Sequence, residues 1–244
     1  MKQFSWTDAV LFAILERSLK LGGRILRYQT ILFDLDGTLT DPGLGITNSI
    51  QYAMEQIGME KPPREELYQF IGPPLLEEFQ KVYGVDRAVS EEMLRHFRVY
   101  FEEKGLYENQ LYEGVLDMLS RLKESACQLV LATSKPEPFA DMILHHFGMR
   151  PFFSTVAGST LDETRTDKAA VIAYALDKAG ITDRSRCIMV GDREHDVFGA
   201  RANGLPSLGV LYGYGSRQEL QKAGALFFAE TVKEIPELLL FRRP

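Results

Sequence analysis

Short apolar runs alternate with amphipathic segments along the second half of the chain. The runs cover residues 31–33, 128–132, 153–157, 188–190 and 208–211. The segments between them repeat apolar residues at the three- and four-residue spacing of a helix, at residues 115–123, 138–147, 167–179 and 196–202. Strands that alternate with helices in this way predict parallel βαβ units. We therefore expect an α/β fold.

Residues 44–109 differ from the rest of the chain because their pattern is helical throughout. Ile46 and Ile50 recur at helical spacing, and Ser90 is expected to cap a later helix that runs to about residue 103. Thr166 is expected to cap the helix that starts at residue 167 in the same way. About four helices between two strand-bearing regions predict an inserted all-α cap domain. The expected division is a core of residues 28–43 and 110–244 with a cap of residues 44–109.

Residues 1–27 form a separate, N-terminal segment with an amphipathic helical pattern. Leu11, Leu15 and Leu19 supply apolar positions, and Gly22-Gly23 is expected to end the helix. One interpretation is a helix that binds a membrane surface or a partner, and the other is an accessory extension of the core. We favour the accessory extension because the segment carries few aromatic anchors.

Composition and charge narrow the classes of function. The net charge of −6 gives no basic excess for a nucleic-acid polymer. No apolar run reaches the ~18 residues of a membrane span, and the pattern near the N-terminus does not match a signal peptide. Cys127 and Cys187 both border apolar runs and are expected to be buried free thiols. A reducing, cytoplasmic setting fits these features, and both a monomer and a homodimer remain open.

Two aspartates stand at the end of the first predicted strand. Asp34 and Asp36 follow the apolar run 31–33, in the position where open α/β sheets place their ligand crevice. Residues two apart in an extended chain point the same way, so their like charges require a cation or a shared proton. Asp36-Gly37 is also a common turn dipeptide, and the pair alone does not decide between a turn and a chemical site.

Further polar groups follow later strands or begin later helices. Thr133 and Ser134 come directly after the run 128–132, where hydroxyl and amide groups can hold an anion. Lys168 falls in the first turn of a predicted helix, against the preference of the helix dipole. Asp192 and Asp196 lie at another junction between a strand and a helix. Four carboxylates at strand ends favour a hard cation such as Mg²⁺, which prefers oxygen ligands.

Four motifs follow one another along the chain: Asp34-Leu35-Asp36-Gly37-Thr38, Thr133-Ser134, Lys168, and Gly191-Asp192 with Asp196. In this order they resemble the motifs of the haloacid-dehalogenase-like phosphatase superfamily. The resemblance covers about residues 29–240, and the helical insert resembles a type-1 cap. The stretches Ile71-Gly72-Pro73-Pro74-Leu75 and Gly158-Ser159-Thr160-Leu161-Asp162 look most like the phosphoglycolate-phosphatase and 5′-nucleotidase branch. The resemblance implies a Rossmann-like parallel core.

The resemblance also implies a role for each site residue. Asp34 would attack phosphorus and form an aspartyl-phosphate, and Asp36 would act as general acid and base. Thr133, Ser134 and amides of the loop at Gly37 would hold phosphoryl oxygens, and Lys168 would neutralise charge. Metal ligands for Mg²⁺ would come from Asp34, the backbone carbonyl of Asp36, Asp192 and Asp196, the last directly or through water.

Several alternatives remain open. The expected substrate is a small phosphorylated metabolite, such as a nucleoside monophosphate or a phosphoglycolate-like acid. Asp36 makes carbon–halogen chemistry unexpected, because true dehalogenases lack this second aspartate. A β-phosphoglucomutase-like phosphotransferase shares the aspartyl-phosphate, and a catalytically idle binding or regulatory module is a third possibility. Lys135 either contacts the substrate or is solvated before Pro136, and His195 is interpreted as a turn residue.

Overall fold

The computed structural model describes residues 26–162 and 164–240. The predicted N-terminal helix therefore lies outside the described residues, except for the last two positions of the segment 1–27. Within the described ranges, no helix is long and apolar enough to cross a membrane.

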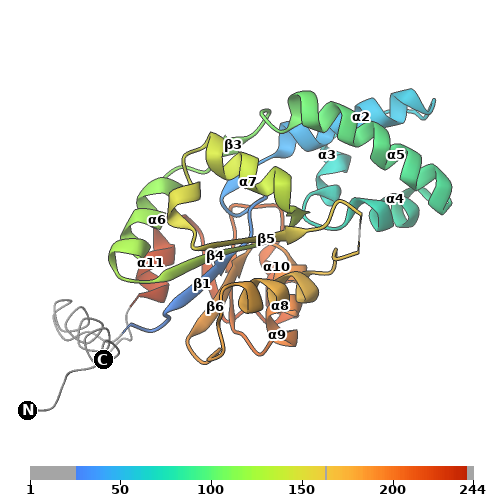
Figure 1. Cartoon of the computed structure of the whole chain (residues 1–244). Helices are drawn as coiled ribbons and strands as arrows, with labels where there is room; N and C mark the ends of the chain where they lie inside the picture. Colours follow the sequence, from blue (N-terminus) through green and yellow to red (C-terminus); the bar gives the residue numbers. More distant parts are fainter. Residues whose placement is uncertain (1–25, 163, 241–244) are drawn as a thin grey trace, which may run out of the picture.

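A six-stranded sheet forms the centre of the molecule, and all of its neighbouring strands are parallel (Figure 1). Its strands, in spatial order, are β5 (Thr155–Ser159), β4 (Gln128–Pro136), β1 (Thr30–Phe33), β6 (Cys187–Gly191), β7 (Ser207–Val210) and β8 (Phe227–Ala229). The expected α/β fold with a parallel core is confirmed.

Helices cover both faces of this sheet. The core helices are α6 (Val115–Glu124), α7 (Glu137–His146), η3 (Arg150–Phe152), α8 (Lys168–Lys178), α9 (Glu194–Ala202), α10 (Arg217–Ala223) and α11 (Glu234–Leu239). The helices α6, α7 and α11 pack on one face, α8 and α9 cover the other, and α10 packs against α9 (Figure 1).

The side chains of the central strand β1 point alternately to the two faces of the sheet and are buried on both. Ile31 and Phe33 pack in the apolar cluster under α6 and α7, whereas Leu32 packs in the cluster under α8 and α9. All three side chains are fully buried, and burial of each contributes about 1.5–3 kcal/mol. In register, Phe33 lies opposite Leu131 of β4 and Val190 of β6. The last residue of β1 is thus held between two strands that end at the same edge.

A helical insert separates β1 from β4 along the chain. It contains α2 (Gly43–Gln56), α3 (Arg64–Leu67), η1 (Tyr68–Phe70), α4 (Leu75–Tyr83), α5 (Arg87–Tyr100) and η2 (Phe101–Gly105). A short antiparallel pair of strands, β2 (Thr40–Asp41) and β3 (Gln110–Leu111), connects the insert to the core. The insert lies beside the sheet edge at which β1 ends (Figure 1).

Two predicted helix starts are wrong. The helix α5 begins at Arg87, and its N-cap is Asp86, whose carboxylate accepts the backbone N–H of Val89 at 2.9 Å. Ser90 lies one turn inside the helix, and its hydroxyl donates to the carbonyl of Asp86. Likewise, Asp167 rather than Thr166 caps α8, through the backbone N–H of Ala170. In both cases an aspartate near the expected cap takes the same role.

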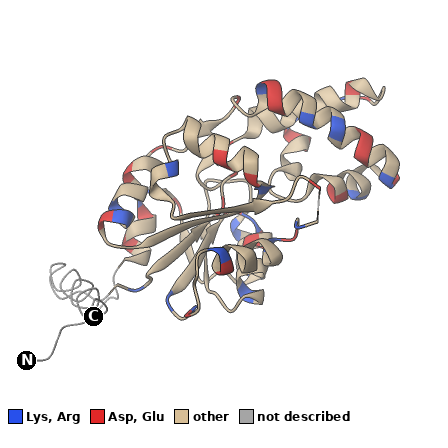
Figure 2. Ribbon diagram, in the orientation of Figure 1, with Lys and Arg blue, Asp and Glu red and all other residues tan. Residues whose placement is uncertain are grey.

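Charged residues lie mainly on the helices and loops, and the strands of the sheet are almost free of them (Figure 2). The buried ionic groups gather instead where β1, β4 and β6 end: Asp34, Asp36, Lys135, Lys168, Asp192 and Asp196. Buried charges are costly unless they are paired or bind an ion, so this cluster is the candidate functional site.

Candidate active site

Three parallel strands position the predicted site residues. Asp34 follows β1 directly, Thr133 lies within β4, and Asp192 follows β6. Because parallel strands end at one edge of the sheet, these residues become neighbours although they are far apart in sequence. Lys168 begins α8, and Asp196 lies in the first turn of α9.

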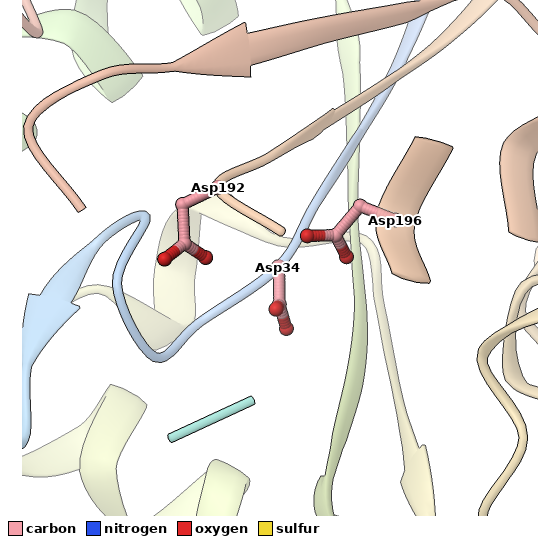
Figure 3. A group of neighbouring side chains, drawn as sticks. All are labelled: Asp34, Asp192 and Asp196. Carbon is pink, nitrogen blue, oxygen red and sulfur yellow. The ribbon is translucent and has the colours of Figure 1, made fainter. Parts of the chain in front are cut away.

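Asp34, Asp192 and Asp196 form a buried triad of carboxylates (Figure 3). One oxygen from each lies within 4.8 Å of the others. Burial, together with the charges of Asp196 and Asp34, raises the pKa of Asp192 well above its usual value. Burial likewise raises the pKa of Asp196 to about 6, although Lys168 opposes this. Buried carboxylate oxygens at this spacing suit a hard divalent cation as ligands, and such a cation would offset the repulsion between the three carboxylates.

Lys168 supplies a positive charge beside the triad. Its Nζ lies 2.8 Å from Asp34 Oδ1 and 2.8 Å from Asp196 Oδ1. Burial alone would lower the pKa of Lys168, but the carboxylates of Asp196 and Asp34 outweigh it and raise that pKa. The lysine is therefore held as an ammonium. Its position at the start of α8 against the helix dipole is compensated by these two contacts.

Asp36 has different surroundings from Asp34. Its Oδ2 lies 2.7 Å from Lys135 Nζ, whereas its buried Oδ1 has no hydrogen-bond partner among the described residues. Burial raises the pKa of Asp36, and the charge of Lys135 opposes the rise. The Asp36 carboxylate is not part of the triad, so of this residue only the backbone carbonyl remains available for the expected metal site.

Gly37 lies against the acidic triad, and Thr133 and Ser134 lie beside Asp34 and Asp36. Gly37 has φ +80°, and a Cβ there would lie 2.2 Å from Asp192 Oδ2. Asp192 Oδ2 also accepts the backbone N–H of Tyr214 at 2.8 Å, which fixes the carboxylate. Thr133 and Ser134 both line the cavity described next.

A cavity of about 80 Å³ lies between the site and the helical insert. Asp34, Asp36 and Lys135 line it from the core side. In the described chain, every lining residue from the insert is apolar except Arg98; these residues are Ile46, Phe70, Gly72, Pro73, Pro74, Leu75, Leu94, Phe97, Arg98 and Phe101. The wall opposite the carboxylates is thus largely apolar.

Two contacts between the core and the insert could not be predicted from the sequence. Lys135 Nζ lies 4.5 Å from the ring centroid of Phe101, so the lysine touches both Asp36 and the insert. Arg193 donates to the carbonyl oxygen of Ile71 across the same boundary. Phe101 lies in the helical pattern of residues 44–109, and Arg193 directly follows the Gly191-Asp192 motif. Neither pattern indicates a contact with a residue so distant in sequence.

A buried carboxylate in contact with an ammonium, within an acidic triad that fits a divalent cation, is suited to phosphoryl transfer and lies at the end of a parallel strand. The sequence profile of the family described as Haloacid dehalogenase-like hydrolase matches residues 31–210. The chain belongs to this family.

Individual relatives agree with this assignment. A 5′-nucleotidase of Pseudomonas aeruginosa is 46% identical over 196 residues, which cover 80% of this chain and 88% of that protein. The tyrosine-protein kinase PtkA of Mycobacterium tuberculosis is 36% identical over 86% of this chain and 72% of its own. A crystal structure described as a predicted phosphatase from Clostridium acetobutylicum superposes with a TM-score of 0.84 at 42% identity, covering 86% of this chain and 97% of that one. The expected superfamily and branch are confirmed, and the chain is a phosphatase hydrolase.

Proposed function

We propose that the chain is a Mg²⁺-dependent phosphatase that hydrolyses a small phosphorylated metabolite through a phosphorylated Asp34. A nucleoside monophosphate or a phosphoglycolate-like acid is the proposed kind of substrate. The observation that carries the proposal is the 2.8 Å contact between Asp34 and Lys168, because Asp34 also lines the cavity together with Asp36.

Asp34 is the proposed nucleophile. Its carboxylate attacks phosphorus in line, and the bond between phosphorus and the ester oxygen breaks. Lys168 touches the attacking carboxylate and balances the negative charge that gathers on the phosphoryl group. The contact of the same lysine with Asp196 keeps its ammonium in place.

Asp36 is the proposed general acid and base. Its unpartnered Oδ1 belongs to a residue that lines the cavity, where the leaving oxygen must be protonated. The same carboxylate then takes a proton from the water that hydrolyses the aspartyl-phosphate. Lys135 holds Oδ2 at 2.7 Å and so orients the free oxygen.

Asp34, Asp192 and Asp196 are the proposed side-chain ligands of Mg²⁺, together with the backbone carbonyl of Asp36. Bound there, the ion would neutralise charge on the phosphoryl oxygens. Tyr214 and Gly37 keep Asp192 in position, the first by a hydrogen bond and the second by leaving room for the carboxylate.

Thr133, Ser134 and the backbone amides of the loop at Gly37 are the proposed ligands of the phosphoryl oxygens.

Residues 44–109 are the proposed cap over the core of residues 28–43 and 110–244. The small cavity supports a compact substrate that enters while the cap is displaced, because a cavity of about 80 Å³ is far below the usual ~300–1,000 Å³ of ligand pockets. We also propose a cytoplasmic setting, which the two buried free thiols Cys127 and Cys187 support.

Phosphate release from p-nitrophenyl phosphate, followed by a panel of phosphorylated metabolites, tests the function. The expected result is release that requires Mg²⁺ and is lost in Asp34→Asn. Asp117→Asn is the matched control, because Asp117 is exposed on α6. Release no greater than that of Asp34→Asn on the whole panel would refute hydrolysis. Conversion of a sugar phosphate to its isomer would indicate a mutase instead.

A further inference from the structure

One side chain of the segment between β6 and α9 reaches from the core to the helical insert. Arg193 directly follows Asp192, and its Nη1 donates to the carbonyl oxygen of Ile71 at 2.7 Å. The two residues are 122 positions apart in sequence. The side chain of Arg193 is 16% exposed, so water competes little for this contact. A hydrogen bond from a charged donor in such surroundings is stronger than one between neutral groups.

The same guanidinium is anchored on its core side. Its Nε donates to Glu219 Oε1 at 2.9 Å, and this oxygen also accepts the backbone N–H of Glu194 at 2.9 Å. The backbone N–H of Arg193 donates to Asp196 Oδ2 at 3.1 Å. The core alone therefore sets the position of the arginine, whether or not Ile71 is in contact.

On the side of the insert, the contact falls on the loop that walls the cavity. Residues 72–75 line the cavity directly after Ile71. Gly72 has φ +105°, and a Cβ there would lie 3.1 Å from Arg193 Cγ. A glycine permits both this backbone conformation and the close approach of the arginine. The loop and the arginine therefore fit each other closely at this boundary.

We propose that Arg193 is a positioning residue that holds the loop 71–75 closed over the active site. The guanidinium stays bound to Glu219 when the loop moves away, and it binds Ile71 again when the loop returns. Its effect on catalysis rests on the proposed function, but its effect on the loop does not. Loss of one charge-assisted hydrogen bond would increase the open population of the loop by about tenfold.

Hydrogen–deuterium exchange on the full chain tests the proposal directly. Arg193→Met removes the guanidinium but leaves the backbone N–H that binds Asp196. We expect exchange of the backbone amides of residues 70–72, 75 and 76 to become about tenfold faster, with no change in the strands of the core. Arg217→Met is the matched control, because Arg217 pairs with Glu230 at the surface. Arg193→Lys should restore part of the protection, since one ammonium can serve only part of the two contacts.

Steady-state kinetics with p-nitrophenyl phosphate supply the second readout. We expect KM to rise by up to about tenfold in Arg193→Met, with a smaller change in kcat, because the loop then closes less firmly over the bound substrate. Unchanged exchange at residues 70–76 would overturn the proposal whatever the activity. Faster exchange throughout the core would also overturn it, since the arginine would then support the whole fold. A wild-type chain without phosphatase activity would refute the proposed function and leave the exchange experiment decisive.

Discussion

The substitution Gly37→Ala tests whether the loop after β1 and the acidic triad depend on each other. Gly37 has φ +80°, and an added Cβ would lie 2.2 Å from Oδ2, 2.5 Å from Cγ and 2.8 Å from Oδ1 of Asp192. Ordinary contact begins at 3.4 Å, so the carboxylate must move away. The hydrogen bond from the backbone N–H of Tyr214 to Oδ2 opposes that movement.

The matched control is Gly58→Ala. Gly58 has φ +73°, and a Cβ there would meet nothing within 4 Å. Both substitutions place an alanine in the left-handed region, which costs about 1–2 kcal/mol. At roughly 2–4 °C per kcal/mol for a chain of this size, Gly58→Ala should lower the Tm by about 2–8 °C. Gly37→Ala carries the same backbone cost and also displaces a carboxylate of the triad.

The assay is a Mg²⁺ titration of phosphate release, with the Tm measured at each concentration. Displacement of Asp192 should raise the Mg²⁺ concentration for half-maximal activity by at least about 10–100-fold, the range found when groups that orient metal ligands are lost. Gly58→Ala should leave that concentration unchanged despite its lower Tm. Equal half-maximal concentrations in Gly37→Ala and the wild type would refute the reasoning, because the loop would then adjust without disturbing the triad.

Other side chains of the site allow three shorter tests. Lys168→Met should lower kcat by about 10²–10³-fold because it removes the charge beside Asp34, and a kcat within a few-fold of the wild type would contradict this role. Asp36→Asn should lower turnover of p-nitrophenyl phosphate by about 10²–10⁴-fold and let the phosphorylated enzyme accumulate in acid-quench experiments, because p-nitrophenolate leaves without an acid but no base then activates water. Lost turnover without accumulation would place the defect before the intermediate. Phe101→Ala should lower the free energy of unfolding in urea by about 3–5 kcal/mol, since the ring is buried and stacks on Phe97. The exposed Tyr107→Ala is its control, and a loss no larger than that of the control would contradict the packing argument.

The fold could be predicted from local patterns because the core strands are apolar runs separated by helices. The strand β8 could not be predicted, because Phe227–Ala229 is only three residues long and its apolar and polar residues do not alternate. Ser90 precedes two glutamates, a pattern that predicts a helix cap, but Asp86 lies one turn earlier and takes that role. Helix ends were therefore predicted less well than the helices themselves.

The candidate site could be predicted in outline because Asp34 and Asp192 each follow a parallel strand and Thr133 lies near the end of another. The topology alone then brings them to one edge of the sheet. The contact of Lys135 with Asp36 could not be predicted, since nothing local distinguishes it from a solvated lysine before a proline. The contact of Arg193 with Ile71 depends on how the insert sits on the core, and no pattern in the sequence records that arrangement.

The ribbon of β2 and β3 has a consequence for how such a chain can change. Thr40 pairs with Leu111 and Asp41 pairs with Gln110, so the insert leaves and re-enters the core at adjacent points. A segment whose two ends are neighbours can be lengthened, shortened or exchanged without altering the register of the strands that carry the carboxylates. Grafting a different insert between positions 42 and 109 is therefore a route to new selectivity that leaves the chemistry of the sheet edge in place.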